Sequence, residues 1–346
     1  MRRRAFLTTT ALAACVSARP LRAFAANSSA TTTGTLHTVR GPIEVAQMGT
    51  TLVHEHVLVD FIGASRVSRS RYDADEAFRT ILPHLVDVQK RGVKTLFECT
   101  PAYLGRDPLL LRRLSEASGL QIVTNTGYYG AAKDVAVPKH AYTETPAQLA
   151  ARWTAEFRDG IEGTDIRPGF VKIGVDAAPL SAIDKKLAEA GALCHLETGL
   201  TLAIHTADGP AATEILEILH KGGVSPEAYV WVHSQNDKET GRRATATRRG
   251  AWVSLDGVGP QSLDAHLDAV VALFRDGSLG RVLVSQDAGW YHVGEAGGGS
   301  YRSHSYLFDT FLPALQKRGL TEADVRTLLV DNPARAFAVR RRPRSD

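Results

Sequence analysis

The feature that most constrains the fold of this chain is an alternation of short apolar runs with longer helix-like stretches, from about residue 48 onward. Such alternation implies parallel strands joined by helical crossovers. Eight strand–helix units close naturally into a (β/α)8 barrel. The predicted strands span residues 51–58, 93–98, 121–126, 170–173, 202–205, 229–233, 252–255 and 281–285. The predicted helices span 74–91, 108–118, 146–160, 184–198, 211–221, 239–250, 262–276, 304–318 and 322–330.

An open, doubly wound sheet is the alternative architecture. That fold needs a glycine-rich phosphate loop after its first strand. Residues 59–65 form no such loop. The length of 346 residues would allow two domains, but α/β barrels often exceed 250 residues as one unit. The sequence therefore favours a single barrel domain over residues 37–340.

The N-terminus has the pattern of a targeting segment. Arg3 and Arg4 have the twin-arginine form, a weakly apolar stretch follows, and residues 23–25 form a small-x-small cleavage site. Residues 1–25 are predicted to be a signal peptide read by the twin-arginine export machinery, which implies a periplasmic or secreted protein. A lipid anchor at Cys15 is the alternative. Residues 26–36 are predicted to be a polar linker, and residues 341–346 a solvated basic tail.

The net charge of +4 comes from the leader. Residues 1–25 hold five arginines and no acid, which leaves 36 basic against 37 acidic residues. A domain close to neutrality does not suggest a nucleic-acid partner or an anionic membrane surface. No apolar run is long enough to span a bilayer.

Six polar residues occupy strands or strand ends, where an apolar environment would make burial costly unless they bind something. His54 and His56 are two residues apart on one strand, so both side chains emerge on one face. Four more polar residues each close a separate apolar run, and active sites of such barrels lie at the carboxyl ends of strands. These residues are Lys172, His205, His233 and Asp287. Four histidines and a carboxylate suit zinc, manganese or cobalt.

Lys172 is the unusual member of this set. It follows Phe170 and Val171 and precedes Ile173. Burying an ammonium there would be costly. The lysine could reach the surface, pair with a carboxylate, or lose its proton and take up carbon dioxide as a carbamate, and the residues alone leave all three outcomes open.

The combined pattern resembles the phosphotriesterase family of the amidohydrolase superfamily, across most of residues 50–337. Further stretches carry the resemblance: residues 92–95, 105–107, 126–129, 160–174 and 331–333. The resemblance implies two divalent cations, with zinc expected and cobalt or manganese as alternatives, bridged by carboxylated Lys172 and a hydroxide. It implies His54, His56 and Asp287 as ligands of one cation, and His205 and His233 as ligands of the other. Asp287 would also accept the proton of the hydroxide.

The chain departs from the family after its seventh strand. Phosphotriesterases proper carry a histidine after a Leu-Asp pair, and lactonase-like members an arginine, whereas this chain has Gly257 after Asp256. A proton relay through that histidine would be broken here, so Asp256 or a water would have to replace it.

Three aromatic residues are candidates for the substrate pocket. Tyr129 stands where lactonase-like members place a tyrosine, and its hydroxyl either touches the hydroxide or the substrate, or the ring is only a wall. The glycine-rich segment 287–303 is predicted to be a lid. Within it, Trp290 and Tyr291 are expected to line an apolar leaving-group pocket.

The resulting hypothesis is a hydrolase that attacks a small-molecule lactone or carboxylic ester, with promiscuous action on phosphotriesters. An amidase acting on an N-acyl amide and a phosphotriesterase proper are the alternatives. A non-catalytic metal-binding barrel is a further one, although all six metal positions are filled. Family members often dimerise, so a homodimer stays open.

Overall fold

The structure, a computed structural model, describes residues 33–344. The expected signal peptide, the Cys15 alternative and most of the expected linker lie outside the described residues. No helix within 33–344 is both long and apolar enough to cross a membrane.

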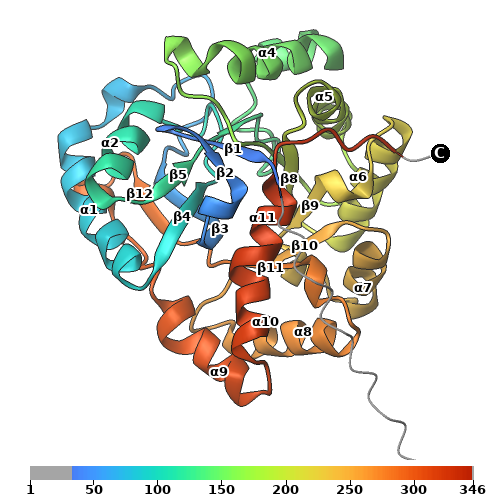
Figure 1. The fold of residues 1–346 in the computed structure, drawn as a ribbon. Coiled ribbons are helices and arrows are strands. Elements are labelled where there is room, and N and C mark those ends of the chain that lie inside the picture. Colours follow the sequence, from blue (N-terminus) through green and yellow to red (C-terminus); the bar gives the residue numbers. More distant parts are fainter. Residues whose placement is uncertain (1–32, 345–346) are drawn as a thin grey trace, which may run out of the picture. The chain divides into compact units, whose positions relative to one another are not determined.

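The described chain forms the expected barrel of parallel strands surrounded by helices (Figure 1). Its eight strand positions follow the chain order. They are β3 (Thr50–Val59), β4 (Val93–Glu98), β5 (Gln121–Val123) with β6 (Asn125–Thr126), β7 (Phe170–Val175), β8 (Thr201–Thr206), β9 (Tyr229–Val232), β10 (Trp252–Leu255) and β11 (Val282–Val284). The ring closes where the Asp287 amide donates to the His54 carbonyl at 3.1 Å. The fold prediction is therefore confirmed.

Two strand positions are interrupted, and the second interruption shapes the site. At the third position, β5 pairs with β4 whereas β6 pairs with β7. At the eighth, β11 pairs with β10, whereas β12 (Gly289–His292) pairs with β3. Asp287 lies in the gap between β11 and β12. The prediction of an irregular lid over 287–303 missed β12, because its glycine-rich sequence lacks an apolar run and only the neighbouring strand orders it.

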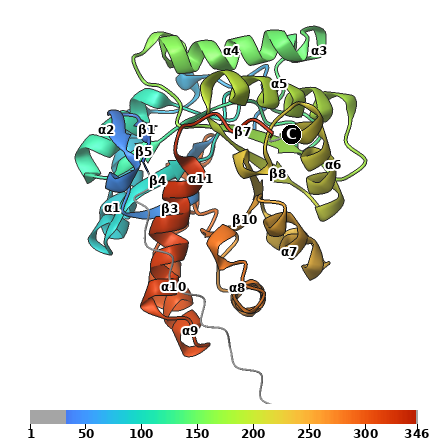
Figure 2. The same ribbon diagram turned by 45° about the vertical axis from the view of Figure 1, so that its right-hand side comes forward.

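The helices cover the outside of the barrel, and their ends follow the capping chemistry of the sequence. Asp107, for example, accepts hydrogen bonds from the amides of Leu109 and Leu110 at the start of α2, where Pro108 opens the helix. The turned view in Figure 2 shows α4 alongside α5. The helices are α1 (Ala74–Lys90), α2 (Pro108–Ser118), α3 (His140–Thr143), α4 (Pro146–Asp159), α5 (Ala182–Thr198), α6 (Gly209–Lys221), α7 (Thr240–Arg248), α8 (Leu263–Arg275), α9 (Leu312–Lys317), α10 (Glu322–Arg326) and α11 (Asn332–Phe337).

The last two predicted helices differ from the observed elements. The expected helix 304–318 begins as a π-helical turn (Leu307–Phe311) that leads into α9. The expected helix 322–330 is α10 followed by a second π-helical turn (Thr327–Asp331), which continues into α11. The short α3 and α11 were not predicted, since each offers less than two turns of periodicity.

A hairpin of β1 (Thr35–Thr38) and β2 (Gly41–Glu44) covers the amino-terminal end of the barrel. Leu36 is fully buried there, in one cluster with Phe97, Phe170 and Phe337. The ring centroids of Phe97 and Phe337 lie 4.3 Å apart. Strand β1 therefore includes the last two residues of the expected linker, and Leu36 adds apolar surface to the core at this end of the barrel.

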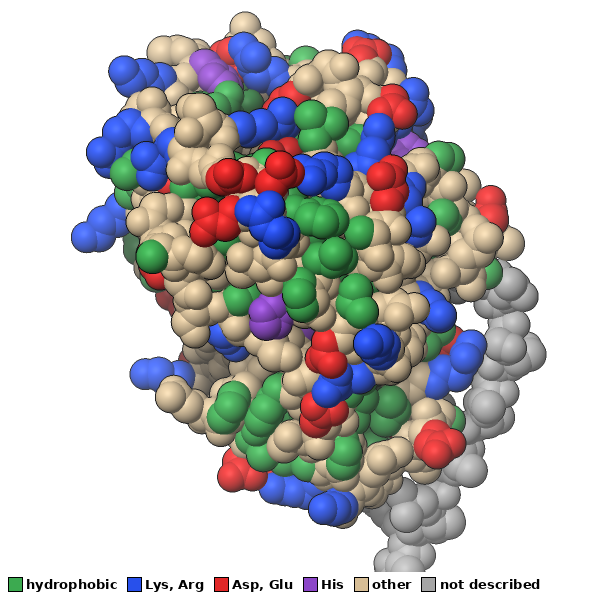
Figure 3. Space-filling view, turned by 90° about the vertical axis from the view of Figure 1, so that its left-hand side faces the viewer, with side chains coloured by type: hydrophobic (Ala, Val, Ile, Leu, Met, Phe, Trp, Pro, Cys, Tyr) green, Lys and Arg blue, Asp and Glu red, His purple; other side chains and the backbone are tan. Residues whose placement is uncertain are grey.

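The prediction of a solvated basic tail is wrong for Arg342, which is buried. Its guanidinium donates to the carbonyls of Ala336 and Ala338 at 3.1 and 3.0 Å, and its amide donates to Nε2 of His195 at 2.9 Å. The carbonyls at the end of α11 need donors, and Arg342 supplies them. On the face drawn in Figure 3, by contrast, basic and acidic side chains are interspersed, as expected of an ordinary solvated surface.

Candidate metal centre

The first cluster of the centre joins β3 to the segment after β11. Nε2 of His56 lies 3.1 Å, and Nε2 of His54 3.6 Å, from Oδ1 of Asp287. One ligand atom from each residue falls within 4.8 Å of the others. Both histidines are buried, and they share a face of β3 as the alternation predicted. These three residues form a group able to hold a metal ion.

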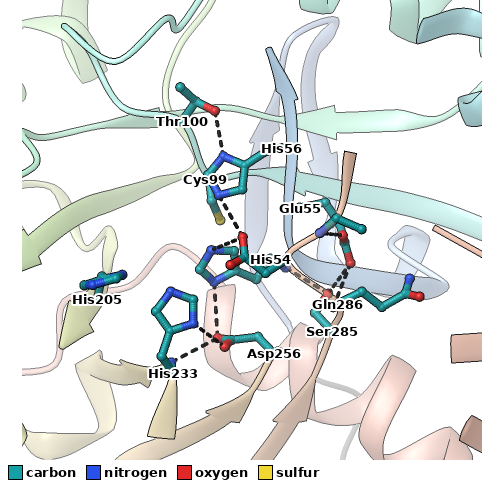
Figure 4. Close-up of polar contacts among 12 residues, drawn as sticks. His54, Glu55, His56, Cys99, Thr100, His205, His233, Asp256, Ser285 and Gln286 are labelled. Atoms are coloured by element: carbon teal, nitrogen blue, oxygen red, sulfur yellow. Dashed lines mark hydrogen bonds and ion pairs between the residues drawn. The ribbon is translucent and has the colours of Figure 1, made fainter. Parts of the chain in front are cut away.

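A second cluster overlaps the first through His54 and contains Asp256, a fully buried carboxylate after β10. Asp256 accepts hydrogen bonds from Nδ1 of His233 at 2.6 Å and from Nδ1 of His54 at 3.2 Å (Figure 4). These bonds, against the opposing effect of burial, keep the pKa of Asp256 well below its ordinary value. An ionised carboxylate only accepts, so both Nδ1 atoms carry protons, and in the neutral form of each ring the lone pair lies on Nε2.

His56 is oriented by a different partner. Its Nδ1 lies 2.7 Å from Oγ1 of Thr100, just beyond β4. Burial lowers the pKa of His56 to about 4. A neutral imidazole offers a lone pair on one nitrogen, which is the form that binds a cation. Sequence patterns gave no signal for Thr100, because a threonine after a strand is common.

Glu55, between the two histidines, points to the opposite face of β3 and holds the segment that carries Asp287. It is fully buried and accepts the amides of Gln286 at 3.1 Å and Ala288 at 2.8 Å, as well as the Ser285 hydroxyl at 2.7 Å. Asp287 has a φ of 51°, a left-handed conformation that needs support from its surroundings. Glu55 thus binds both neighbours of a strained residue.

Two further histidines, His304 and His292, lie on the segment that follows Asp287. His304 is buried, with Nδ1 3.1 Å from Oε2 of Glu55 and Nε2 3.2 Å from the Tyr301 hydroxyl. It therefore belongs to the Glu55 network, away from the ligand nitrogens. His292 is half-buried and stacks against Trp290 with ring centroids 6.1 Å apart.

The other half of the predicted centre contains His205, in β8, and His233, directly after β9. Their ring centroids lie 4.5 Å apart, and those of His233 and His54 lie 4.9 Å apart. Burial holds the pKa of His205 well below its ordinary value. The hydroxyl of Tyr129 lies 3.2 Å from Nδ1 of His205. The structure therefore brings the four histidines and Asp287 into one contiguous group.

Lys172 points into the same interior, on the face of β7 that also carries Phe170. It is 1% exposed, with Nζ 5.8 Å from the centre of the Tyr129 ring. The charge of Lys172 contributes to the lowered pKa values of His54 and His205, where burial is the larger cause. No ion pair within residues 33–344 involves this lysine.

The chemistry of this donor set fits divalent cations. Oδ1 of Asp287 is buried and has no hydrogen-bond partner. Such an atom is costly in a folded protein unless something binds it. The Nε2 atoms of His54 and His56 face it, and nitrogen and oxygen ligands of this kind suit zinc, cobalt or manganese.

An aromatic shelf flanks the centre. Trp290 packs on His56 with ring centroids 4.1 Å apart and also lies near Phe61 at 5.8 Å. Phe61 is an exposed large apolar side chain. Tyr291 differs from the prediction: alternation along β12 turns it away from the shelf into the core, where it is buried under Gly298.

Gly257 lies under a side chain from another loop. A Cβ atom at this position would stand 2.7 Å from Nε2 of Gln235. Gln235 donates to Oδ1 of Asp256 at 3.1 Å and accepts the Asp256 amide at 3.3 Å. Asp256 is thus hydrogen-bonded to His54, His233 and Gln235. In this position it orients two of the predicted ligand histidines, whereas the sequence suggested it as a replacement for the missing proton relay.

Two hollows of the described surface lie away from this centre. A groove of about 1170 Å³ runs over α4, α5 and α6 on the outside of the barrel. A polar pocket of about 400 Å³ contains the ion-paired Arg106 and Glu156. Neither is lined by any of the predicted ligands.

The closed barrel of parallel strands and the overlapping histidine–carboxylate clusters place this protein in the class of (β/α)8 barrels with a candidate metal site. The chain belongs to the phosphotriesterase family, whose family model matches residues 34–337. This confirms the family resemblance and makes the chain a member of a family of hydrolases with a binuclear metal site.

The chain aligns with similar proteins over nearly their full lengths. The phosphotriesterase homology protein of Escherichia coli (strain K12) is 30% identical over 293 residues, covering 84% of this chain and 98% of the relative. The N-acetyltaurine hydrolase of Salmo salar is 25% identical, covering 87% and 97%. One solved structure, concerning organophosphate hydrolysis activity engineered from a weak promiscuous lactonase template, superposes with a TM-score of 0.79 at 27% identity, covering 88% and 99%.

Proposed function

We propose that this protein hydrolyses a lactone or carboxylic ester with two divalent cations held at the centre described above. The observation that carries the proposal is the buried, unpartnered Oδ1 of Asp287 facing the Nε2 atoms of His54 and His56. A structural role for Asp287 would leave this atom unsatisfied, whereas a cation would satisfy it.

The nitrogen and oxygen atoms at the centre indicate which residues would hold each cation. His54, His56 and Asp287 would hold one cation, and His205 and His233 the other. Lys172 would join the two as a carbamate, which is supported by its burial without a counter-ion. When bound, such a pair of cations lowers the pKa of a water molecule and polarises the carbonyl oxygen of the substrate.

The proton released in hydrolysis has an acceptor in Asp287. Burial opposes ionisation of this carboxyl, but the adjacent imidazoles of His56 and His54 lower its pKa. The carboxylate is therefore present at neutral pH to take the proton at Oδ2, the oxygen that does not face His54 and His56. Its segment is fixed because Trp290 Nε1 donates to the Asp287 carbonyl at 2.7 Å.

Tyr129 is suited to bind the substrate oxygen. Burial raises the pKa of Tyr129, so the hydroxyl keeps its proton at neutral pH. The hydroxyl stands at His205, and it would donate to the carbonyl oxygen of an ester as negative charge develops there. The shelf of Trp290 and Phe61 offers apolar surface for an acyl or leaving group.

Amide hydrolysis is the second candidate, because a relative that spans most of this chain is an N-acetyltaurine hydrolase. The same donor set would serve an amide carbonyl. The two candidates differ in the leaving group, since an amine must be protonated to leave, whereas the phenolate of an aryl ester leaves without a proton. Phosphotriesters are a third group of substrates, expected to be turned over less efficiently, since Gly257 offers no relay side chain.

The experiment is a substrate screen with the zinc-, cobalt- and manganese-loaded protein. Lactones, aryl esters, N-acyl amides and phosphotriesters would be compared for kcat/KM, with Asp287→Asn as the matched inactive variant. The proposal expects turnover of lactones or esters that falls by roughly 10²–10⁴-fold in the variant. Turnover restricted to amides would select the second candidate, and no turnover of any class would reject a hydrolytic role for these substrates.

A further inference from the structure

Arg302 lies on the segment that follows β12 and contacts the backbone that carries Asp287. Its backbone pairs with Gly289: the Gly289 amide donates to the Arg302 carbonyl at 3.0 Å, and the Arg302 amide donates back at 2.8 Å. The guanidinium contacts the backbone around Asp287: Nη1 donates to the Asp287 carbonyl at 2.9 Å, and Nη2 donates to the Gln286 carbonyl at 3.3 Å. Its position is thus fixed at both ends.

The charge of this guanidinium has no acidic partner. Both acceptors are neutral carbonyls, and no ion pair within residues 33–344 involves Arg302. Other arginines on neighbouring segments are paired, as Arg71 is with Asp60 at 2.7 Å. Arg302 is exposed, and three of the five N–H groups of an arginine stay available after two have donated.

The β10–α8 loop passes beside the guanidinium, and the residue nearest to it there is a glycine. A Cβ atom at Gly259 would lie 3.7 Å from Nη2 of Arg302. Glycine at this position brings no side chain against the guanidinium, whose exposed and unpaired charge can therefore meet a ligand.

The aromatic shelf lies close by. Trp290 Nε1 and Arg302 Nη1 both donate to the carbonyl oxygen of Asp287. Because both groups donate to the Asp287 carbonyl oxygen, the indole of Trp290 and the guanidinium of Arg302 lie next to each other. A ligand at the centre therefore meets apolar surface and a positive charge together.

We propose that Arg302 binds an oxyanion group of the substrate, so that the substrates of this protein are esters or amides that carry a carboxylate, sulfonate or phosphate. Guanidinium groups bind such oxyanions in pairs of parallel hydrogen bonds. This inference rests on the proposed hydrolase function and adds the charge of the substrate to it. Arg302 is thereby a substrate-binding residue as well as a support for the Asp287 segment.

The test compares pairs of substrates in which a carboxylate is replaced by a neutral group: 4-acetoxybenzoate against its methyl ester, and N-acetylphenylalanine against its amide. The wild type is expected to prefer the acid of each pair. In Arg302→Gln the ratio of kcat/KM for acid over neutral should fall at least tenfold, mainly through KM, and Arg302→Lys should recover part of it. Arg158→Gln, an exposed arginine on α4, should leave the ratio unchanged.

An equal loss for acid and neutral substrates would overturn the inference, because it would mean that Arg302 only supports Asp287. A binding measurement separates this inference from the proposed function. The product 4-hydroxybenzoate, followed by calorimetry, should bind the metal-loaded wild type at least tenfold more tightly than Arg302→Gln even if none of the four substrates is hydrolysed. Equal binding to both proteins would also overturn it.

Discussion

Oδ1 of Asp256 accepts a hydrogen bond from Nδ1 of His233 at 2.6 Å. The same buried carboxylate accepts a hydrogen bond from Nδ1 of His54, so it connects the two halves of the centre. A carboxylate behind a ligand histidine fixes its tautomer and its ring orientation. Asp256 therefore acts through the histidines, as a positioning residue.

Replacing Asp256 with asparagine should weaken metal binding by roughly 10–100-fold. An amide accepts less strongly than a carboxylate, and its NH₂ group would face an imidazole proton. A competition titration of zinc against a chromophoric chelator measures the effect. Asp264→Asn, at an exposed position on α8, is the control. Unchanged zinc affinity in Asp256→Asn would show that the carboxylate does not orient the ligands.

Glu55→Gln should lower both stability and turnover. Glutamine has one acceptor oxygen for the four donors that converge on Glu55, so some of them would lose their partner in a fully buried place. We expect a loss of about 3 kcal/mol in the free energy of unfolding, measured by urea denaturation. Glu116→Gln, on the exposed face of α2, should change it little. A Glu55→Gln protein as stable as the wild type would contradict this account of the Asp287 segment.

Glu98 predicts a pH dependence of stability. Burial raises its pKa from 4.5 to about 7, and its Oε2 is buried without a partner. The folded state therefore keeps a proton that the unfolded state releases near pH 4.5, so stability falls as the pH rises from about 4.5 to 7. Glu98→Gln removes this titration. The variant should gain stability relative to the wild type across that window, by up to about 3 kcal/mol; Glu189→Gln, exposed on α5, should show no such trend. A stability difference that stays constant with pH would exclude this role for Glu98.

Arg342→Ala should destabilise the barrel, although Arg342 belongs to a run of arginines that reads as a solvated tail. The change removes donors from buried carbonyls at the end of α11, and we expect a loss of about 2 kcal/mol by thermal or urea unfolding. Arg344→Ala, two residues further on and exposed, is the matched control. Equal stability of the two variants would refute the structural role.

The sequence predicted the barrel and the convergence of the four histidines with Asp287, because both follow from local patterns. Strand–helix alternation sets the topology, and residues at the carboxyl ends of parallel strands must meet. The positions of His54 and His56 on one face needed only the period of a strand.

The residues that position the ligands could not be predicted, because they act over long sequence separations. Thr100 meets His56 from the next strand, and Asp256 meets His54 across 202 residues. Strand β12 was missed since its pairing with β3 orders a sequence with no apolar pattern of its own. Tyr291 was misplaced for the same reason, because the direction of its side chain depends on the register of that strand.

The most direct test of the central claim is the metal content of the folded protein after reconstitution with zinc, measured by mass spectrometry of the metal. We expect about two zinc ions per wild-type chain. In Lys172→Ala, shown to be folded by circular dichroism, we expect no more than one, with partial recovery on addition of a short carboxylate such as propionate. A wild-type chain that binds no zinc, or a Lys172→Ala protein that keeps both ions, would contradict the account.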